Sequence, residues 1–320
     1  MTDGIDPATL DRFRADMAAL GCSPQQVLLV AVSGGADSLA LLLLTHALAG
    51  ERCRAATVDH GLRAEARGEA EWVAALCAQR GVPHAILSAP LPARVAGSAN
   101  LSGRARALRH TLLIEEADRV GASAILMAHH ADDQAETLMM RLNRGSGVGG
   151  LSGVRAVNGR VVRPLLGWRR AELAAIVAAA GLTAVDDPTN GDMRFDRARM
   201  RRHLADAPWL DIGAVAQSAA WLAEADAALE WSMARLIDER WQEDASGVQL
   251  NAADLPDELA RRLILRALLA IEPEAMPRGE QVTRIVAALR RGETSTLGGV
   301  LCATRGGRWT FCLAPPRRSL

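Results

Sequence analysis

The feature that most constrains the fold is a glycine-rich turn between an apolar strand and an apolar helix. Residues 27–32 are all apolar, and a leucine-rich run begins at Leu39. Between them lies Ser33-Gly34-Gly35-Ala36-Asp37-Ser38. Glycines let the backbone turn sharply and approach an anion, and the N-terminus of the following helix points more amides at the same place. The segment therefore predicts a phosphate-binding loop.

The side chains of this loop agree with a bound phosphate. Ser33 and Ser38 can add hydroxyl donors to the amides of Gly34, Gly35 and Ala36. Asp37 would repel a phosphate directly, so we expect a Mg²⁺ ion between them. The alternative interpretation is an ordinary strand-to-helix turn in which Asp37 or Ser38 caps the helix.

The first ~185 residues alternate short apolar runs with longer helical patterns, within an expected catalytic domain of residues 1–205. This alternation predicts an α/β fold, a Rossmann-like parallel sheet covered by helices. Glycines at the ends of the first three helices mark where they stop. The expected strands are 27–32, 54–58, 84–88 and 124–128, with 161–164 as an edge strand. The expected helices are 37–49, 64–80, 101–120, 131–143 and 169–180.

Composition changes after about residue 205, and we expect a second, smaller and mostly helical domain over 206–320. Residues 208–291 are rich in Ala, Leu, Glu and Trp and predict a bundle of three or four helices. Four tryptophans in this region are expected to anchor helix cores: Trp209, Trp221, Trp231 and Trp241. Residues 300–304 and 309–313 predict a terminal β-hairpin.

Composition also excludes several chemistries. All 37 basic residues are arginine, which excludes a Walker-type phosphate loop, a protein kinase and a Schiff-base enzyme, since each needs a lysine. The five cysteines form no CxxC pair, which argues against a zinc or iron–sulfur site. The apolar runs are too short to cross a bilayer and the acidic N-terminus does not resemble a signal peptide, so we expect a cytoplasmic protein without membrane association.

Polar residues also follow the second and fourth predicted strands. Asp59 ends the second strand and could bind adenine or ribose, or could simply make a turn. His129 ends the fourth and could contact a phosphate or a base. His130 should be structural, because adjacent residues on a strand point to opposite faces.

Asp133 and Glu136 are spaced so that both carboxylates lie on one side of a helix. Such a pair could hold an ammonium group or a second Mg²⁺, and one member could accept a proton from an attacking amine. The alternative is that these acids merely favour a helix N-terminus.

A cluster of arginines follows the α/β region and predicts a patch for RNA backbone or nucleotide phosphates. We expect tRNA contacts from Arg194, Arg197, Arg199 and Arg201.

The loop SGGADS resembles the signature of the PP-loop ATP pyrophosphatases. This resemblance implies ATP as cofactor, pyrophosphate held on the loop, and adenylation of a carbonyl oxygen of the substrate. A nitrogen or sulfur nucleophile would then displace AMP.

Five further motifs narrow the resemblance to the tRNA(Ile)-lysidine synthetases, over roughly residues 27–205. They are VDHGLR at 58–63, AHHADDQAET at 128–137, LNRGSG at 142–147, RPL at 163–165 and DDPTN at 186–190. The resemblance implies that the wobble cytidine of the isoleucine tRNA with a CAU anticodon is adenylated at its C2 oxygen. Free L-lysine then attacks C2, giving lysidine and AMP. It assigns catalytic roles to Asp37, His129, Asp133 and Glu136, and it is compatible with a homodimer.

Other functions fit the sequence less well. A PP-loop tRNA thiolase of the 2-thiocytidine type depends on CxxC cysteines, which this chain lacks. GMP and asparagine synthetases use related loops but lack the HHxDDxxET pattern. A nucleotide-sensing module without turnover would not need carboxylates beside the phosphates.

Overall fold

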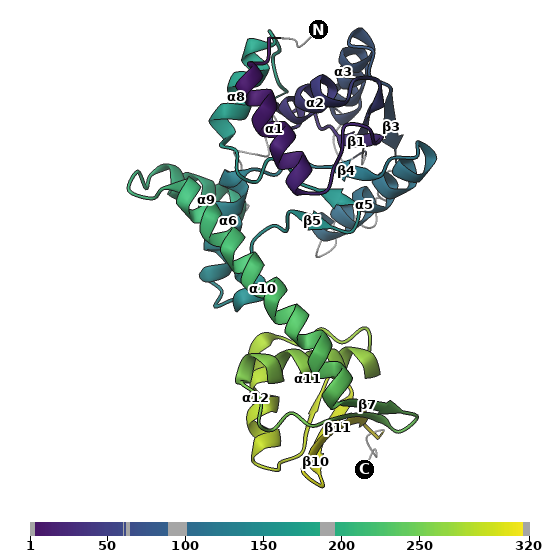
Figure 1. The fold of residues 1–320 in the computed structure, drawn as a ribbon, viewed down its shortest axis with the longest axis vertical. Coiled ribbons are helices and arrows are strands. Elements are labelled where there is room, and N and C mark those ends of the chain that lie inside the picture. The colour runs from purple at the N-terminus through teal and green to yellow at the C-terminus, as the bar shows by residue number, and fades with distance from the viewer. Residues whose placement is uncertain (1–3, 60, 62–64, 89–100, 186–195, 316–320) are drawn as a thin grey trace. The chain divides into compact units, whose positions relative to one another are not determined.

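The computed structural model describes residues 4–59, 61, 65–88, 101–185 and 196–315 (Figure 1). The chain divides into two units, one formed by Met1–Arg144 with Ser152–Ala220 and the other by Gly145–Leu151 with Trp221–Leu320. The division falls after Ala220 and not at the expected residue 205, because the helix Asp196–Ala205 (α9) packs on the helix Ala131–Leu142 (α6) of the first unit.

The first unit is built on a six-stranded sheet in the order β3-β2-β1-β4-β6-β5. The first five strands in this order are parallel, and β5 is antiparallel to β6. The predicted Rossmann-like α/β class is therefore confirmed. The strands are β1 (Leu28–Ala31), β2 (Cys53–Asp59), β3 (His84–Ser88), β4 (Ala124–Leu126), β5 (Val157–Asn158) and β6 (Val161–Val162).

Helices cover both faces of this sheet. Leu28 and Val30 of β1 share one core with α2, whereas Leu29 shares another with Leu113 and Ala117 of α5. This alternation follows from the two-residue period of a strand. The remaining helices of the unit are α1 (Pro7–Ala19), α2 (Ala36–Ala49), the 3₁₀ turn η1 (Gly50–Arg52), α3 (Glu65–Gln79), α5 (Leu101–Arg119) and α8 (Arg170–Ala179).

The first helix, α1, is a structural element that was not predicted from the sequence. It contacts α2, which also contacts α8 (Figure 1). Phe13 of α1 meets Trp168 edge-on with ring centroids 6.5 Å apart, and the Trp168 indole N–H donates to Asp16 at 2.7 Å. These contacts bury α1 against the helical layer that contains α2.

The prediction of an edge strand at 161–164 was wrong. β6 lies between β4 and β5, because the turn at Gly159 folds two residues of β5 back onto it. Pro164, which cannot donate a ladder hydrogen bond, lies beyond the end of β6.

The second unit packs helices on a five-stranded antiparallel sheet in the order β7-β8-β11-β10-β9. The predicted hairpin is confirmed as β10 and β11, but the predicted helical bundle is interrupted by strands that were not predicted. The elements are α7 (Val148–Leu151), α10 (Ile212–Arg240, which begins in the first unit), β7 (Trp241–Asp244), β8 (Gly247–Leu250), α11 (Asp257–Ile271), α12 (Gly279–Arg290), β9 (Ser295–Leu297), β10 (Val300–Arg305) and β11 (Arg308–Leu313).

Three of the four tryptophans expected in helix cores are exposed. The exposed fractions are 80% for Trp209, 62% for Trp221 and 61% for Trp231. The buried residues along α10 are instead smaller or polar side chains, such as Met233 and Asp226. Among the described helices, none is long and apolar enough to cross a membrane.

Candidate active site

Two polar segments lie at the carboxyl edge of the parallel sheet. Residues 33–38 follow β1, and residues 127–133 follow its neighbour β4. The chain leaves β1 toward β2 on one side and reaches β4 on the other, so the strand order reverses between them. Ligands of open α/β sheets bind at such a switch point.

The loop after β1 is held by its own serines and by a neighbouring backbone. The Ser33 N–H donates to Ser38 Oγ at 3.1 Å, and this hydroxyl donates to the Gly35 carbonyl at 2.9 Å. Gly34 has φ +87° and accepts a hydrogen bond from the Val185 N–H at 3.0 Å. Only glycine adopts this backbone conformation readily, so the loop is preorganised before any ligand arrives.

Asp37 lies in the first turn of α2 but does not cap the helix. The N-cap residue is Gly35, and in the described part of the chain no side chain bonds to that cap. Asp37 Oδ2 faces His130, and its buried Oδ1 has no hydrogen-bond partner among the described residues. The helix-cap alternative is therefore not what the structure shows.

His130, which was expected from the sequence to be structural, lies in the centre of this acidic site. It is 4% exposed, and its Nε2 lies 3.4 Å from Asp37 Oδ2 and 3.5 Å from Asp133 Oδ2. Its Nδ1 lies 3.5 Å from Asp132 Oδ2. Burial alone would lower the pKa of His130, but the three carboxylates outweigh it and raise this pKa to about 9. The residue is therefore an imidazolium at neutral pH.

Asp132 connects this imidazolium to the start of α8. Its carboxylate accepts from the Arg169 guanidinium at 3.2 Å and from the Arg170 backbone N–H at 2.9 Å. Burial opposes ionisation, but the nearby His130 imidazolium and the hydrogen bonds from Arg169 and Arg170 hold the pKa of Asp132 well below its usual range. The loop after β1, the start of α6 and the start of α8 are thus joined through charged groups.

His129 has the opposite electrostatic environment. Burial lowers its pKa, and although Asp133 opposes this, the guanidiniums of Arg163, Arg106 and Arg197 lower the pKa further, to about 4. The neutral ring has a buried Nδ1 with no hydrogen-bond partner in the described ranges. The His129 ring can therefore form a hydrogen bond with a ligand, but it carries no charge at neutral pH.

Asp133 and Glu136 lie together as expected, and two of the predicted tRNA-binding arginines are bound to them. Arg197 donates to Glu136 at 3.0 Å and to Asp133 at 3.2 Å, while Arg201 donates to Glu136 at 2.8 Å. Glu136 is 2% exposed. Asp133 also accepts from the His130 backbone N–H at 3.2 Å, as residues near a helix start commonly do. The arginine cluster and the carboxylate pair thus form one network, which was not predicted from their positions in the sequence.

The other predicted residues lie as follows. Asp59 is at the carboxyl end of β2, and its Oδ1 accepts a hydrogen bond from the Gly61 N–H at 2.9 Å. Asp59 therefore makes the expected turn, and its other carboxylate oxygen can still contact a ligand. Arg199 is exposed and pairs with Asp196 one turn earlier on α9. Arg194 and the motif at 186–190 fall outside the described residues.

The donors around Asp37 fit a magnesium ion. Carboxylate and phosphate oxygens are its preferred ligands, and the buried unpartnered Oδ1 of Asp37 is such an oxygen. The residues that the structure describes contain no group of three or more His, Cys, Asp or Glu that could hold a metal by protein ligands alone. The unpartnered Oδ1 of Asp37 could supply one protein ligand, and phosphate oxygens of the nucleotide could supply others.

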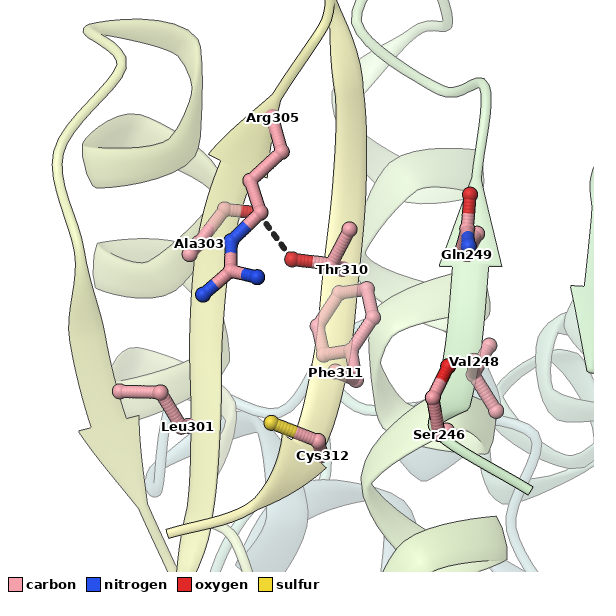
Figure 2. A pocket seen from close by; sticks show the side chains of 10 residues that line it. Ser246, Val248, Gln249, Leu301, Ala303, Arg305, Thr310, Phe311 and Cys312 are labelled. Carbon is pink, nitrogen blue, oxygen red and sulfur yellow. Dashed lines mark hydrogen bonds between the residues drawn. The ribbon is translucent and has the colours of Figure 1, made fainter. Parts of the chain in front are cut away.

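A separate hollow in the second unit lies on the outer face of its sheet, between β8, β10 and β11 (Figure 2). It has a volume of about 210 Å³, and Figure 2 shows Gln249, Ala303, Thr310 and Arg305 along it. Its lining contains neither a carboxylate nor a histidine, so we assign the chemistry to the edge of the parallel sheet.

Comparison with known proteins agrees with this site. A family model described as a PP-loop domain matches residues 8–207. A U34-tRNA thiolase from Methanococcus maripaludis shares the fold, with a TM-score of 0.56 and 16% identity over 67% of this chain and 75% of that chain. The fold and the site thus define a PP-loop ATP-binding enzyme.

Closer relatives make the assignment more specific. A protein of Novosphingobium aromaticivorans named tRNA(Ile)-lysidine synthase is 47% identical over 319 residues, covering 96% of this chain and 94% of that protein. A protein of Zymomonas mobilis subsp. mobilis with the same name is 41% identical over 297 residues, covering 90% and 89%. The chain belongs to the tRNA(Ile)-lysidine synthase family, and it is an ATP-dependent ligase.

Proposed function

We propose that this chain, acting in the cytoplasm, converts the wobble cytidine of the CAU-anticodon isoleucine tRNA to lysidine with ATP and free L-lysine. The observation that carries this proposal is the single network at the switch point. There the loop 33–38 is linked through His130 to Asp133, which shares Arg197 with Glu136. One site thus combines groups for a triphosphate with carboxylates for a cationic nucleophile.

In the first half-reaction the cytidine O2 forms a bond to the α-phosphorus, and the bond to the bridging oxygen of pyrophosphate breaks. The backbone amides of Gly34 and Gly35 and the hydroxyl of Ser33 hold the departing pyrophosphate, as preorganised donors do for developing charge. Asp37 would bind Mg²⁺, which when present neutralises phosphate charge. His129, neutral at pH 7, positions the base or the α-phosphate, and Asp59 contacts the nucleoside.

In the second half-reaction the ε-amine of lysine forms a bond to C2, and the C2–O bond to AMP breaks. Asp133 and Glu136 bind the incoming ammonium, and one carboxylate takes a proton so that the nitrogen can attack. Adenylation makes this displacement feasible, because AMP leaves far more readily than an oxygen bound only to the ring.

The ion pairs of Arg197 and Arg201 suggest a physical reason for ATP and tRNA to bind before lysine. Among the described residues, the two carboxylates of Asp133 and Glu136 are paired with the two guanidiniums of Arg197 and Arg201, so neither acid is free for lysine in the absence of ligand. Phosphates of ATP and tRNA compete for these guanidiniums. When the guanidiniums turn to phosphate, Asp133 and Glu136 are free for the ammonium, so lysine binds after the polyanions.

Binding of the rest of the tRNA is assigned to Arg194, Arg199 and the second unit. A homodimer is also part of the proposal. Neither assignment is needed for the chemistry at the switch point.

The test is to measure pyrophosphate release and AMP release separately, with a CAU-anticodon isoleucine tRNA transcript and with lysine present or absent. We expect both products to depend on the tRNA and labelled lysine to appear in the RNA. A transcript with uridine at the wobble position is the matched substrate control. Asp37→Asn should reduce pyrophosphate release by about 100-fold, as loss of one electrostatic group commonly does. The proposal would be contradicted if pyrophosphate were released at the same rate without tRNA. It would also be contradicted if Asp37→Asn kept the activity of the parent chain.

A further inference from the structure

A glycine-rich segment follows α6, the helix that carries the pair of carboxylates. Five of the nine residues at 145–153 are glycine. Gly145–Leu151 belongs to the second unit, whereas Arg144 before it and Ser152 after it belong to the first. The chain therefore leaves the first unit just after α6 and soon returns to it. We call residues 145–151 the crossing segment.

In the second unit the crossing segment lies against a buried ion pair. Asp226 of α10 is 1% exposed, and the Arg262 guanidinium of α11 donates to its Oδ1 at 2.6 Å (both helices are labelled in Figure 1). A Cβ atom on Gly149 would lie 3.1 Å from the same Oδ1 and 3.7 Å from Arg262 Nη2. Gly149 therefore packs directly on the ion pair, and a side chain there would displace the carboxylate.

The Asp226 carboxylate is held firmly in this place. Arg262 is also bonded to Glu258 at 2.9 Å and to Glu230, so its guanidinium is fixed by three carboxylates. A buried ion pair adds little stability compared with apolar side chains of the same volume. It does fix one docking geometry for the crossing segment, because Asp226 Oδ1 leaves room for glycine at position 149 and not for a side chain.

In the first unit the chain that follows the crossing segment is bonded to α6 itself. Gln134 of α6 donates to the Val154 carbonyl at 2.9 Å and accepts from the Val154 N–H at 2.6 Å. Arg141 donates to the Gly153 carbonyl at 2.9 Å. Gly153 has φ +66°, and a Cβ there would lie 2.3 Å from Gln134 Oε1. The returning chain is thus held closely to the helix from which it left.

A displacement of the crossing segment is therefore passed to α6. The segment is covalently continuous with the end of α6, and the chain after it is bonded to Gln134. Gln134 lies between Asp133 and Glu136 in the sequence of α6. Both carboxylates accept hydrogen bonds from Arg197, so a small shift of α6 changes the geometry of these ion pairs.

We propose that Asp226 is a positioning residue for the ligation: by holding Gly149 it transmits tRNA binding by the second unit to the carboxylate pair of α6. Asp226 acts through the crossing segment and not by touching substrate. When tRNA engages the second unit, the crossing segment holds α6 where Asp133 and Glu136 take the lysine ammonium. The inference rests on the proposed function, because it requires lysine to bind at these carboxylates.

The test compares the full-length CAU-anticodon isoleucine tRNA transcript with its isolated anticodon stem-loop. The stem-loop supplies the wobble cytidine, whereas the full-length RNA also engages the second unit. For the parent chain we expect the KM for lysine to be at least about fivefold lower with the full-length RNA, which is the lower end for coupled sites. Gly149→Ala should raise this KM to the value measured with the stem-loop, and its reaction with the stem-loop should be unchanged.

Gly147→Ala is the matched control within the crossing segment. A Cβ at Gly147 would have no described atom within 4 Å, so this variant should keep the difference between the two RNAs. Asp226→Ala should abolish the difference, as Gly149→Ala does. In Gly149→Ala/Asp226→Ala the added methyl group occupies the vacated space, so the double variant should resemble Asp226→Ala alone. Partial unfolding would lower the apparent kcat with both RNAs and leave both KM values unchanged.

Hydrogen exchange of the α6 amides measures the same coupling without the reaction. In the parent chain, full-length tRNA should slow exchange across residues 131–142 more than the stem-loop does. In Gly149→Ala the two RNAs should slow it equally.

Equal lysine KM values for the two RNAs in the parent chain overturn the proposal, as does a parent-like difference in Gly149→Ala. An exchange difference that survives in Gly149→Ala overturns it as well. If the parent chain forms no lysidine with either RNA, the proposed function fails, and the exchange of the α6 amides then decides by itself whether Asp226 transmits tRNA binding.

Discussion

Nε2 of His130 lies 3.4 Å from Oδ2 of Asp37, so the N-terminus of α6 supplies a counter-charge to the first turn of α2. The two residues are far apart in the sequence and are brought together because β1 and β4 are neighbours in the sheet. The His130 imidazolium thereby offsets the charge of Asp37, so this carboxylate repels the phosphates of a nucleotide less before a metal ion binds.

This contact predicts a pH-dependent stability. The pKa of His130 is raised from 6.5 to about 9 on folding. Its stabilisation is therefore complete below pH 6.5 and is lost as the pH rises through 9. Without Mg²⁺ and ATP, the chain should lose up to about 3 kcal/mol of unfolding free energy across this range. His130→Asn should lack this component, as measured by urea unfolding at several pH values.

The matched control for this experiment is the exposed histidine His203. His203→Asn should keep the pH dependence of the parent chain. If His130→Asn and the parent lose equal stability between pH 6.5 and 9, the imidazolium assignment is incorrect.

The ion pairs of Glu136 predict a strong coupling energy. Arg201→Met leaves a buried carboxylate with one guanidinium fewer, and we expect a loss of about 1–3 kcal/mol in unfolding free energy. In Glu136→Gln/Arg201→Met the charge and its partner are removed together, so the double variant should lose less than the two single variants combined. Urea unfolding of the four proteins completes the cycle, and strict additivity would argue against the pair.

The position of Asp133 beside Glu136 predicts that its removal weakens lysine binding much more than ATP binding. Asp133→Ala should raise the KM for lysine by at least about tenfold, because an ammonium loses one of two carboxylates. The Kd for ATP, measured by isothermal titration, should change much less. Asp196→Ala, which removes an exposed carboxylate of α9, serves as the control. An equal loss of both affinities would show that Asp133 has been given the wrong role.

The loop conformation predicts unequal effects at its two glycines. Gly34→Ala places a Cβ at φ +87° and 3.2 Å from Val185 Cγ2, so we expect a loss of about 1–2 kcal/mol and weaker ATP binding. Gly35 has φ −71°, and a Cβ there would be 3.7 Å from Ser33 Oγ, so Gly35→Ala should fold normally. Gly34→Ala/Val185→Ala should relieve the crowding but not the backbone strain. Equal melting temperatures for Gly34→Ala and Gly35→Ala would show that the positive φ at Gly34 does not restrict the loop to glycine.

Local patterns predicted most of the first unit. Strand 84–88 coincides with β3, and the helices after β1 and β4 begin within one residue of their expected starts. Glycine breaks and apolar periodicity depend on neighbouring residues and are therefore visible in a sequence. The strands β7, β8 and β9 were missed because they are short and partly exposed, so their pairing across the second sheet, not their own pattern, defines them.

The sequence by itself determined the α/β class, the phosphate loop and the clustering of carboxylates after β4, because each follows from residue type and short-range spacing. Only the tertiary structure decided which side chains pair at the edge of the sheet. It turned Arg197 and Arg201 toward Asp133 and Glu136, and it placed His130 against Asp37. It also left Trp221 and Trp231 in solvent. Such pairings depend on which strands and helices become neighbours, and charge attraction and burial act on that proximity and not on sequence distance.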